Sequence, residues 1–194
     1  ARGKSIDNTH LSIDQAERRG FLHRDYIAHC LRWTHVCNYL HKGQRYKTAR
    51  VLDIGAGRDL PMAKMLYSSR LIVEDYVGLD YNSTDKFDLE PFHSGKMPVT
   101  AYGGVVFPEC LHDANDGKPG GESIGYTIGN DDEVHKYPNI ITCFEVLEHV
   151  EPAHSRAMLQ GMLNLLKLDP SARAFISTPC YDAQVGAADN HVSE

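Results

Sequence analysis

The sequence predicts an α/β protein built on a mostly parallel, doubly wound sheet. Short apolar segments alternate with amphipathic, helix-like segments along most of the chain, which is the order of elements in a parallel sheet covered by helices. Several apolar segments end at an acid or at a glycine turn, and ligands of such sheets bind at the carboxyl ends of the strands. The 194 residues, 42% of them hydrophobic and 24% charged, suffice for a single core.

The first 50 residues predict a helix, because residues 13–42 carry apolar side chains at three- and four-residue spacing and Gly43 follows the pattern. We therefore expect an N-terminal helical arm, residues 1–44, and a main domain, residues 45–194. The first 50 residues hold ten Lys and Arg against four Asp and Glu, although the net charge of the chain is −6. A basic segment of this kind could bind a polyanion, or its charges could lie on the solvent-exposed face of a helix.

The first half of the main domain begins with two predicted strands. Residues 50–54 and 71–79 form these strands, and a helix that opens at Pro61 joins them. Residues 83–122 are rich in Gly, Pro and Asp and are too many for a simple connection. They predict an insertion or flap.

The second half continues the alternation of strands and helices. Further strands are predicted at residues 124–128, 139–144 and 172–178, and a helix that opens at Pro152 lies between the last two. Only 16 residues follow Thr178.

The glycine turn after the first strand, in VLDIGAGRDL (residues 51–60), predicts a ligand site. A dinucleotide-binding turn has a third glycine and faces a pyrophosphate. Here the third position is Leu60, and Asp53 would repel a pyrophosphate. A phosphate-binding P-loop is excluded because no Gly-Lys-Ser/Thr follows.

A ligand without phosphate and with a positive centre suits this turn better, and S-adenosylmethionine is such a ligand. Gly55 and Gly57 allow the backbone to approach it, and Asp53 supplies negative charge. Asp80 ends the second strand, where it can accept the ribose hydroxyl hydrogens. Tyr81 beside it offers a flat face for adenine.

Four segments, VLDIGAGRDL, YVGLDYN, NIITCFEVLEHVEP and AFISTPCYD, together resemble the class I S-adenosylmethionine-dependent methyltransferases, which have a Rossmann-like fold. The resemblance covers about residues 45–194, and residues 83–122 depart from it. The family fold has more elements after its fifth strand, so C-terminal strands are expected to be missing here. The resemblance implies that cofactor-binding residues are Asp53, Gly55, Ala56, Gly57, Asp80, Tyr81, Phe144 and, after a third strand, Asp131, with Asp132 as a rival.

An acidic motif follows the fourth predicted strand. Glu145, Glu148 and His149 lie at positions i, i+3 and i+4 and would share one face of a helical turn. With His191 they could hold a divalent metal, as in the similar Glu-x-x-Glu-His motif of methyltransferases that 2′-O-methylate small-RNA 3′ ends and of ubiquinone-biosynthesis O-methyltransferases. Many relatives carry the motif without metal. Alternatively Glu145, His149 or His191 is a general base.

The sequence thus predicts a methyltransferase that uses S-adenosylmethionine to methylate an oxygen or nitrogen of a small molecule. Two alternatives stay open: an RNA 2′-O-methyltransferase with a metal-assisted site, and a non-catalytic, cofactor-binding partner subunit. The five scattered cysteines indicate reduced thiols, and no apolar run is long enough for a membrane span. We therefore expect a cytoplasmic protein without a membrane partner.

Overall fold

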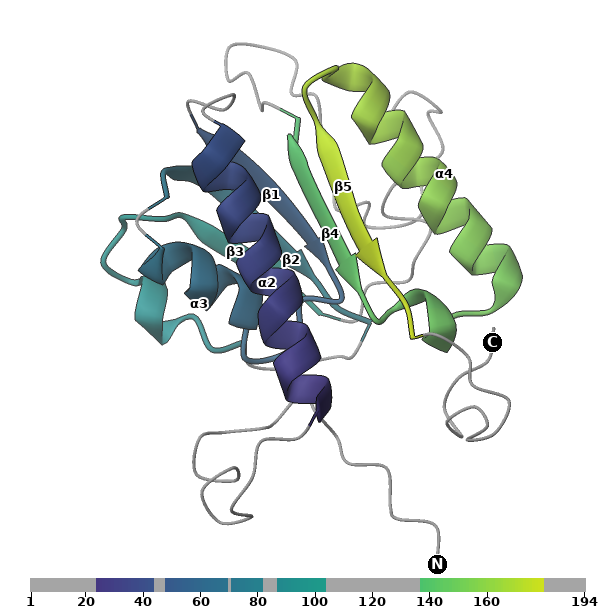
Figure 1. Ribbon diagram of the computed structural model, residues 1–194, viewed down its shortest axis with the longest axis horizontal. Coiled ribbons are helices and arrows are strands. Elements are labelled where there is room, and N and C mark those ends of the chain that lie inside the picture. The colour runs from purple at the N-terminus through teal and green to yellow at the C-terminus, as the bar shows by residue number, and fades with distance from the viewer. Residues whose placement is uncertain (1–23, 44–47, 70, 82–86, 104–136, 180–194) are drawn as a thin grey trace, which may run out of the picture.

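The structure, a computed structural model, describes residues 24–43, 48–69, 71–81, 87–103 and 137–179. Its centre is a five-stranded parallel sheet in the order β3-β2-β1-β4-β5 (Figure 1). The strands are β1 (Ala49–Ile54), β2 (Val73–Leu79), β3 (Val99–Tyr102), β4 (Ile140–Phe144) and β5 (Arg173–Ser177). The predicted α/β class and parallel sheet are therefore confirmed.

The strand order reverses once, between β1 and β4. From β1 the chain adds β2 and then β3 toward one edge, after which it returns to the other side of β1 and adds β4 and β5. In open α/β sheets such a reversal leaves a crevice at the carboxyl ends of the two central strands, where ligands bind. Both the glycine turn after β1 and the acidic motif after β4 lie at this switch point.

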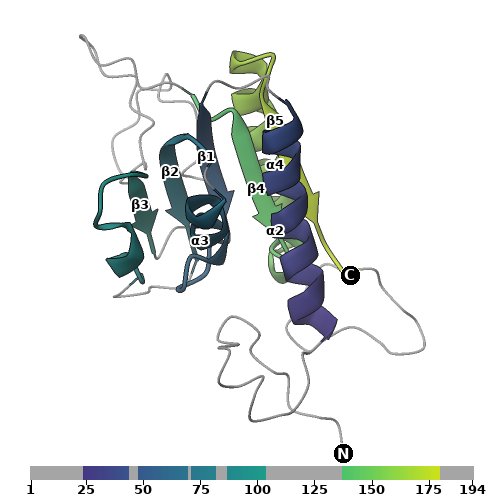
Figure 2. The ribbon, with the colours of Figure 1, turned by 60° about the vertical axis from the view of Figure 1, so that its left-hand side comes forward.

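Helices cover both faces of the sheet, as a doubly wound fold requires (Figures 1 and 2). The helices α2 (Arg24–Gly43) and α3 (Pro61–Ser68) pack on one face, and α4 (Pro152–Leu168) packs on the other. Strand side chains alternate between these faces. Val51 and Tyr76 join the cluster beneath α2 and α3, whereas the cluster beneath α4 contains Leu52, Ile54, Val77, Met158 and Met162.

The C-terminal half of helix α2 packs on the sheet as part of the domain. Val36, Cys37 and Leu40 are buried in the cluster that also contains Tyr76 of β2. The N-terminal half of α2 instead extends past the end of the sheet at which the strand arrows point (Figure 1). The predicted N-terminal helix is therefore present, and its C-terminal half packs in the core.

The strand β3 lies within residues 83–122, which we predicted as an insertion or flap. Val99–Tyr102 pairs in parallel with β2, and the register places Tyr76 beside Val99. Sequence periodicity missed this strand because it is only four residues long and lies at an edge, where each second side chain is exposed. The strand predicted at residues 124–128 lies outside the described residues.

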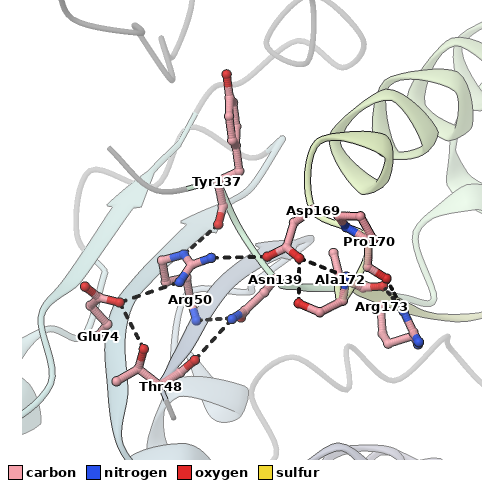
Figure 3. Close-up of polar contacts among 10 residues, drawn as sticks. Thr48, Arg50, Glu74, Tyr137, Asn139, Asp169, Pro170, Ala172 and Arg173 are labelled. Atoms are coloured by element: carbon pink, nitrogen blue, oxygen red, sulfur yellow. Dashed lines mark hydrogen bonds and ion pairs between the residues drawn. The ribbon is translucent and has the colours of Figure 1, made fainter. Parts of the chain in front are cut away.

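A polar cluster lies at the amino-terminal end of the sheet, opposite to the end that carries the glycine turn (Figure 3). The N–H of Arg50 donates to Asn139 Oδ1 at 2.8 Å, and Arg50 Nε donates to the Tyr137 carbonyl at 2.6 Å. The Arg50 guanidinium also lies 3.3 Å from Asp169 and 3.6 Å from Glu74. One arginine of β1 thereby connects β2, β4 and the loop after α4.

Candidate functional site

The glycine turn after β1 directs its N–H groups into the protein. The N–H groups of Gly55 and Ala56 both donate to the Leu79 carbonyl, at 2.8 and 3.0 Å. The next N–H, that of Gly57, donates to Asp80 Oδ2 at 2.9 Å. A phosphate-binding turn needs such N–H groups for the anion, but here protein acceptors occupy all three. A carboxylate also stands beside the turn, so the geometry opposes a pyrophosphate.

Both glycines of the turn have left-handed backbones, with φ of 76° at Gly55 and 68° at Gly57. A Cβ on Gly55 would lie 2.2 Å from Val146 Cγ2, so the loop after β4 packs directly on this glycine. A Cβ on Gly57 would meet only Pro61 Cδ, at 4.0 Å. Val146 therefore fills the space beside Gly55, whereas space remains beside Gly57.

The close packing that a third glycine allows in a dinucleotide-binding turn comes from β2 in this chain. Leu60 occupies the third position with φ 47° and is fully buried. A Cβ on Gly78 would lie 2.9 Å from Ala56 Cβ and 3.3 Å from Leu60 Cδ2. Gly78 thus makes room for the turn and its leucine. Sequence spacing gave no signal for this role, because it depends on the pairing of β1 with β2.

Asp53 lies beneath the turn in a buried hydrogen-bond network. Tyr76 Oη donates to one carboxylate oxygen at 2.5 Å, and Thr142 Oγ1 donates to the other at 2.6 Å. Burial raises the pKa of Asp53 to about 6, although the two hydroxyls lower it, and the charge of Asp80 adds to the increase. Both carboxylate oxygens of Asp53 therefore already accept hydrogen bonds beneath the turn.

Tyr76 and Thr142 had no recognisable signal in the sequence. The register places Thr142 directly beside Asp53, on the neighbouring strand β4. Tyr76 lies two residues before Gly78, the β2 partner of Asp53. Only the pairing of three strands brings these hydroxyls to one carboxylate.

The predicted adenosine-side residues differ in exposure. Asp80 is buried at the end of β2, whereas the side chain of Tyr81 next to it is 69% exposed. Phe144, at the end of β4, is partly buried and packs against the core. Asp131 lies outside the described residues, and the strand beside β2 is Val99–Tyr102, so that strand gives no support for Asp131 as the acid after a third strand.

Glu145, the first residue after β4, has a left-handed backbone with φ 55°. Its N–H donates to the Ser177 carbonyl at 2.9 Å, and its Oε1 accepts a hydrogen bond from Ser177 Oγ at 2.9 Å. The same oxygen lies 2.9 Å from Nη2 of Arg32, a residue of α2. Sequence analysis identified Glu145 but missed Arg32, which is more than 100 residues away in the chain.

The remaining residues of the acidic motif point into different environments. The side chain of Glu148 is 1% exposed and that of His149 is 38% exposed, with His149 Nε2 3.8 Å from Glu148 Oε1. Within the described ranges no three His, Cys, Asp or Glu side chains form a group that could hold a metal. Arg32 already pairs with Glu145 Oε1, and the three described residues of the predicted metal site are not gathered into such a group. His191, the fourth, lies outside the described residues.

The strand order and the glycine turn at its switch point define a Rossmann-like α/β protein. The chain belongs to the family described as "Methyltransferase domain", whose match covers residues 22–192 and so includes α2. A search of the curated proteins gave no match. None of the helices in the described ranges has the length and apolar character needed to cross a membrane.

Fourteen chains of solved structures are similar to this chain. One is PKMT2 from Rickettsia typhi in complex with AdoHcy, with 19% identity, a TM-score of 0.41 and coverage of 66% of this chain and 20% of that chain. Another is a SAM-dependent methyltransferase from Archaeoglobus fulgidus, with 17% identity, a TM-score of 0.34 and coverage of 79% and 64%. The chain therefore spans less than two thirds of either protein.

Proposed function

We propose that this chain is an S-adenosylmethionine-dependent methyltransferase that methylates an oxygen or nitrogen of a small molecule. The observation that carries the proposal is the hydrogen bond from the Gly57 N–H to Asp80. It places a carboxylate at the turn where a dinucleotide would need its phosphates, and family membership supplies the reaction class. The cofactor's sulfonium makes its methyl group electrophilic and its sulfur a good leaving group.

The chain's own residues would hold the cofactor at the ends of β1 and β2. The charge of Asp53 attracts the cationic end of the ligand from beneath the turn. A carboxylate has about four acceptor sites, so Asp80 can accept from Gly57 and from the ribose hydroxyls. The exposed ring of Tyr81 can stack on adenine. These four residues would fix the donor for an in-line transfer, which is the main requirement of the reaction.

His149 is the residue that we infer to be the general base for a hydroxyl acceptor. Its half-exposed imidazole can be reached from solvent, and Glu148 Oε1 lies 3.8 Å from its Nε2, where it can help to orient the ring. Glu145 is less suited to this task because Arg32 and Ser177 already contact its Oε1.

Calorimetry with S-adenosylmethionine, S-adenosylhomocysteine and NADH tests the cofactor assignment. We expect the two adenosyl compounds to bind and NADH not to bind. Binding of NADH alone would refute the proposal. Binding of the cofactor without turnover of any acceptor pool would favour the non-catalytic alternative.

Incubation with methyl-labelled cofactor and a cell extract tests the acceptor class. Label in the metabolite fraction is expected, whereas label in RNA would favour the alternative. An RNA acceptor would also bind with a steep dependence on salt concentration. His149→Gln should lower the rate by about 10²-fold or more without changing cofactor affinity if His149 is the base.

A further inference from the structure

The turn after β4 is held in an unfavourable backbone conformation. Glu145 has φ 55°, a left-handed value that costs a side-chain-bearing residue free energy and persists only where surrounding contacts impose it. Ser177 of β5 supplies two of these contacts, through its carbonyl and its hydroxyl. The third comes from Arg32, whose Nη2 lies 2.9 Å from Glu145 Oε1.

Arg32 lies in the N-terminal half of α2 and reaches Glu145 at the carboxyl end of β4. Both side chains are mostly buried, with 24% of Arg32 and 19% of Glu145 exposed, so solvent screens their attraction less than it would at the surface. Arg32 Nη1 also lies 3.4 Å from His29 Nδ1, one helical turn earlier. His29 in turn stacks on Trp33, with ring centroids 5.5 Å apart. These contacts restrict where the guanidinium can point.

Val146 connects the turn after β4 to the glycine turn after β1. Val146 follows Glu145 directly, and its Cγ2 fills the space where a Cβ of Gly55 would lie. The backbone of Glu145 therefore sets the position of Val146, and Val146 bounds Gly55. A continuous chain of contacts runs from α2 to the predicted cofactor site.

We propose that Arg32 is a positioning residue for the cofactor site: by its ion pair it holds Glu145 in the left-handed conformation that seats Val146 on Gly55. The inference rests on the proposed function, because the ligand is the one proposed there. Arg32 touches no ligand in this account. Its effect on binding passes through the backbone of Glu145.

A double-mutant cycle on the full chain tests this route, with S-adenosylhomocysteine binding measured by calorimetry. Arg32→Gln should weaken binding by about fivefold or more, a coupling typical of residues in contact. Glu145→Gly relieves the backbone strain, because glycine adopts this φ readily and keeps the N–H that bonds to Ser177. In the Glu145→Gly background, Arg32→Gln should therefore change the affinity less than about twofold.

Arg32→Lys and Arg156→Gln provide the matched variants. Lysine keeps the positive charge, so Arg32→Lys should recover part of the affinity that Arg32→Gln loses. Arg156 is an exposed residue of α4, and Arg156→Gln should bind as the unchanged protein does. If Arg32→Gln lowers the melting temperature but binds normally, Arg32 only docks α2 and the proposal is overturned.

Two further outcomes separate this inference from the proposed function. Equal weakening by Arg32→Gln in both backgrounds would overturn the inference, because the effect would not depend on Glu145. If the unchanged protein binds no S-adenosylhomocysteine, the proposed function itself fails, whatever the variants do. If Arg32→Gln does not fold, the affinity of Arg32→Lys is measured with and without Glu145→Gly. Equal weakening in both backgrounds would again overturn the inference.

Discussion

Gly57 and Asp80 join the ends of two neighbouring strands: the N–H of Gly57, after β1, donates to Asp80 Oδ2, after β2, at 2.9 Å. A backbone donor at this position would otherwise be available to a phosphate. The bond instead fixes a buried carboxylate beside the turn, where it can accept hydrogen bonds from a ligand's hydroxyl groups. The first prediction follows from this pair.

Asp80→Ala should weaken S-adenosylhomocysteine binding by about tenfold or more, because the ribose and Gly57 both lose an acceptor. Asp80→Asn keeps an oxygen for Gly57 and should unfold at nearly the same denaturant concentration as the unchanged protein. Calorimetry and urea unfolding on the two variants separate the roles. Unchanged affinity in Asp80→Ala would show that the carboxylate does not contact the ligand.

Gly55→Ala should destabilise the protein strongly. The new Cβ would lie 2.2 Å from Val146 Cγ2 on a backbone with φ 76°, so steric overlap adds to strain, and we expect a loss of about 2–4 kcal/mol. Gly95→Ala is the matched control, because Gly95 has φ 71° but no atom within 4 Å of its added Cβ. It should lose only about 1 kcal/mol. Similar losses in both variants would contradict the packing of Val146 on Gly55.

Asp53 should give the folding free energy a specific pH dependence. Well below pH 4 the carboxyl is protonated in both states. As the pH rises toward 6, the unfolded chain loses this proton first, since the folded pKa is raised to about 6. Relative to Asp53→Asn, the protein should therefore lose stability across this interval, by on the order of 3 kcal/mol. Urea unfolding of both proteins at several pH values measures it, and a constant difference would refute the buried-carboxyl account.

Arg50 should matter for stability but not for ligand binding. Its guanidinium and backbone connect β1 to Asn139, Tyr137 and Asp169 at the end of the sheet opposite to the site (Figure 3). Arg50→Met would leave partly buried acceptors without their donor and should cost about 1–3 kcal/mol. Calorimetry should find S-adenosylhomocysteine affinity unchanged in the folded variant. A large loss of affinity would mean that the two ends of the sheet are coupled.

The regular elements with clear periodicity were predictable from the sequence. Residues 50–54 and 139–144 are predicted as strands because they are short, mostly apolar segments, and Pro61 and Pro152 mark two helix starts. The strand Val99–Tyr102 was missed because four half-exposed residues carry too little pattern. Asp131 and His191 lie outside the described residues and stay predictions.

Local sequence alone determined the parallel α/β fold, the glycine turn and the acids beside it, since each depends on residues close together in the chain. Tertiary structure decided what those acids contact: Tyr76 and Thr142 for Asp53, Gly57 for Asp80, and Arg32 for Glu145. The physical reason is that strand register and helix docking, which are set by burial of the whole apolar surface, bring distant side chains together. No short stretch of sequence contains that information.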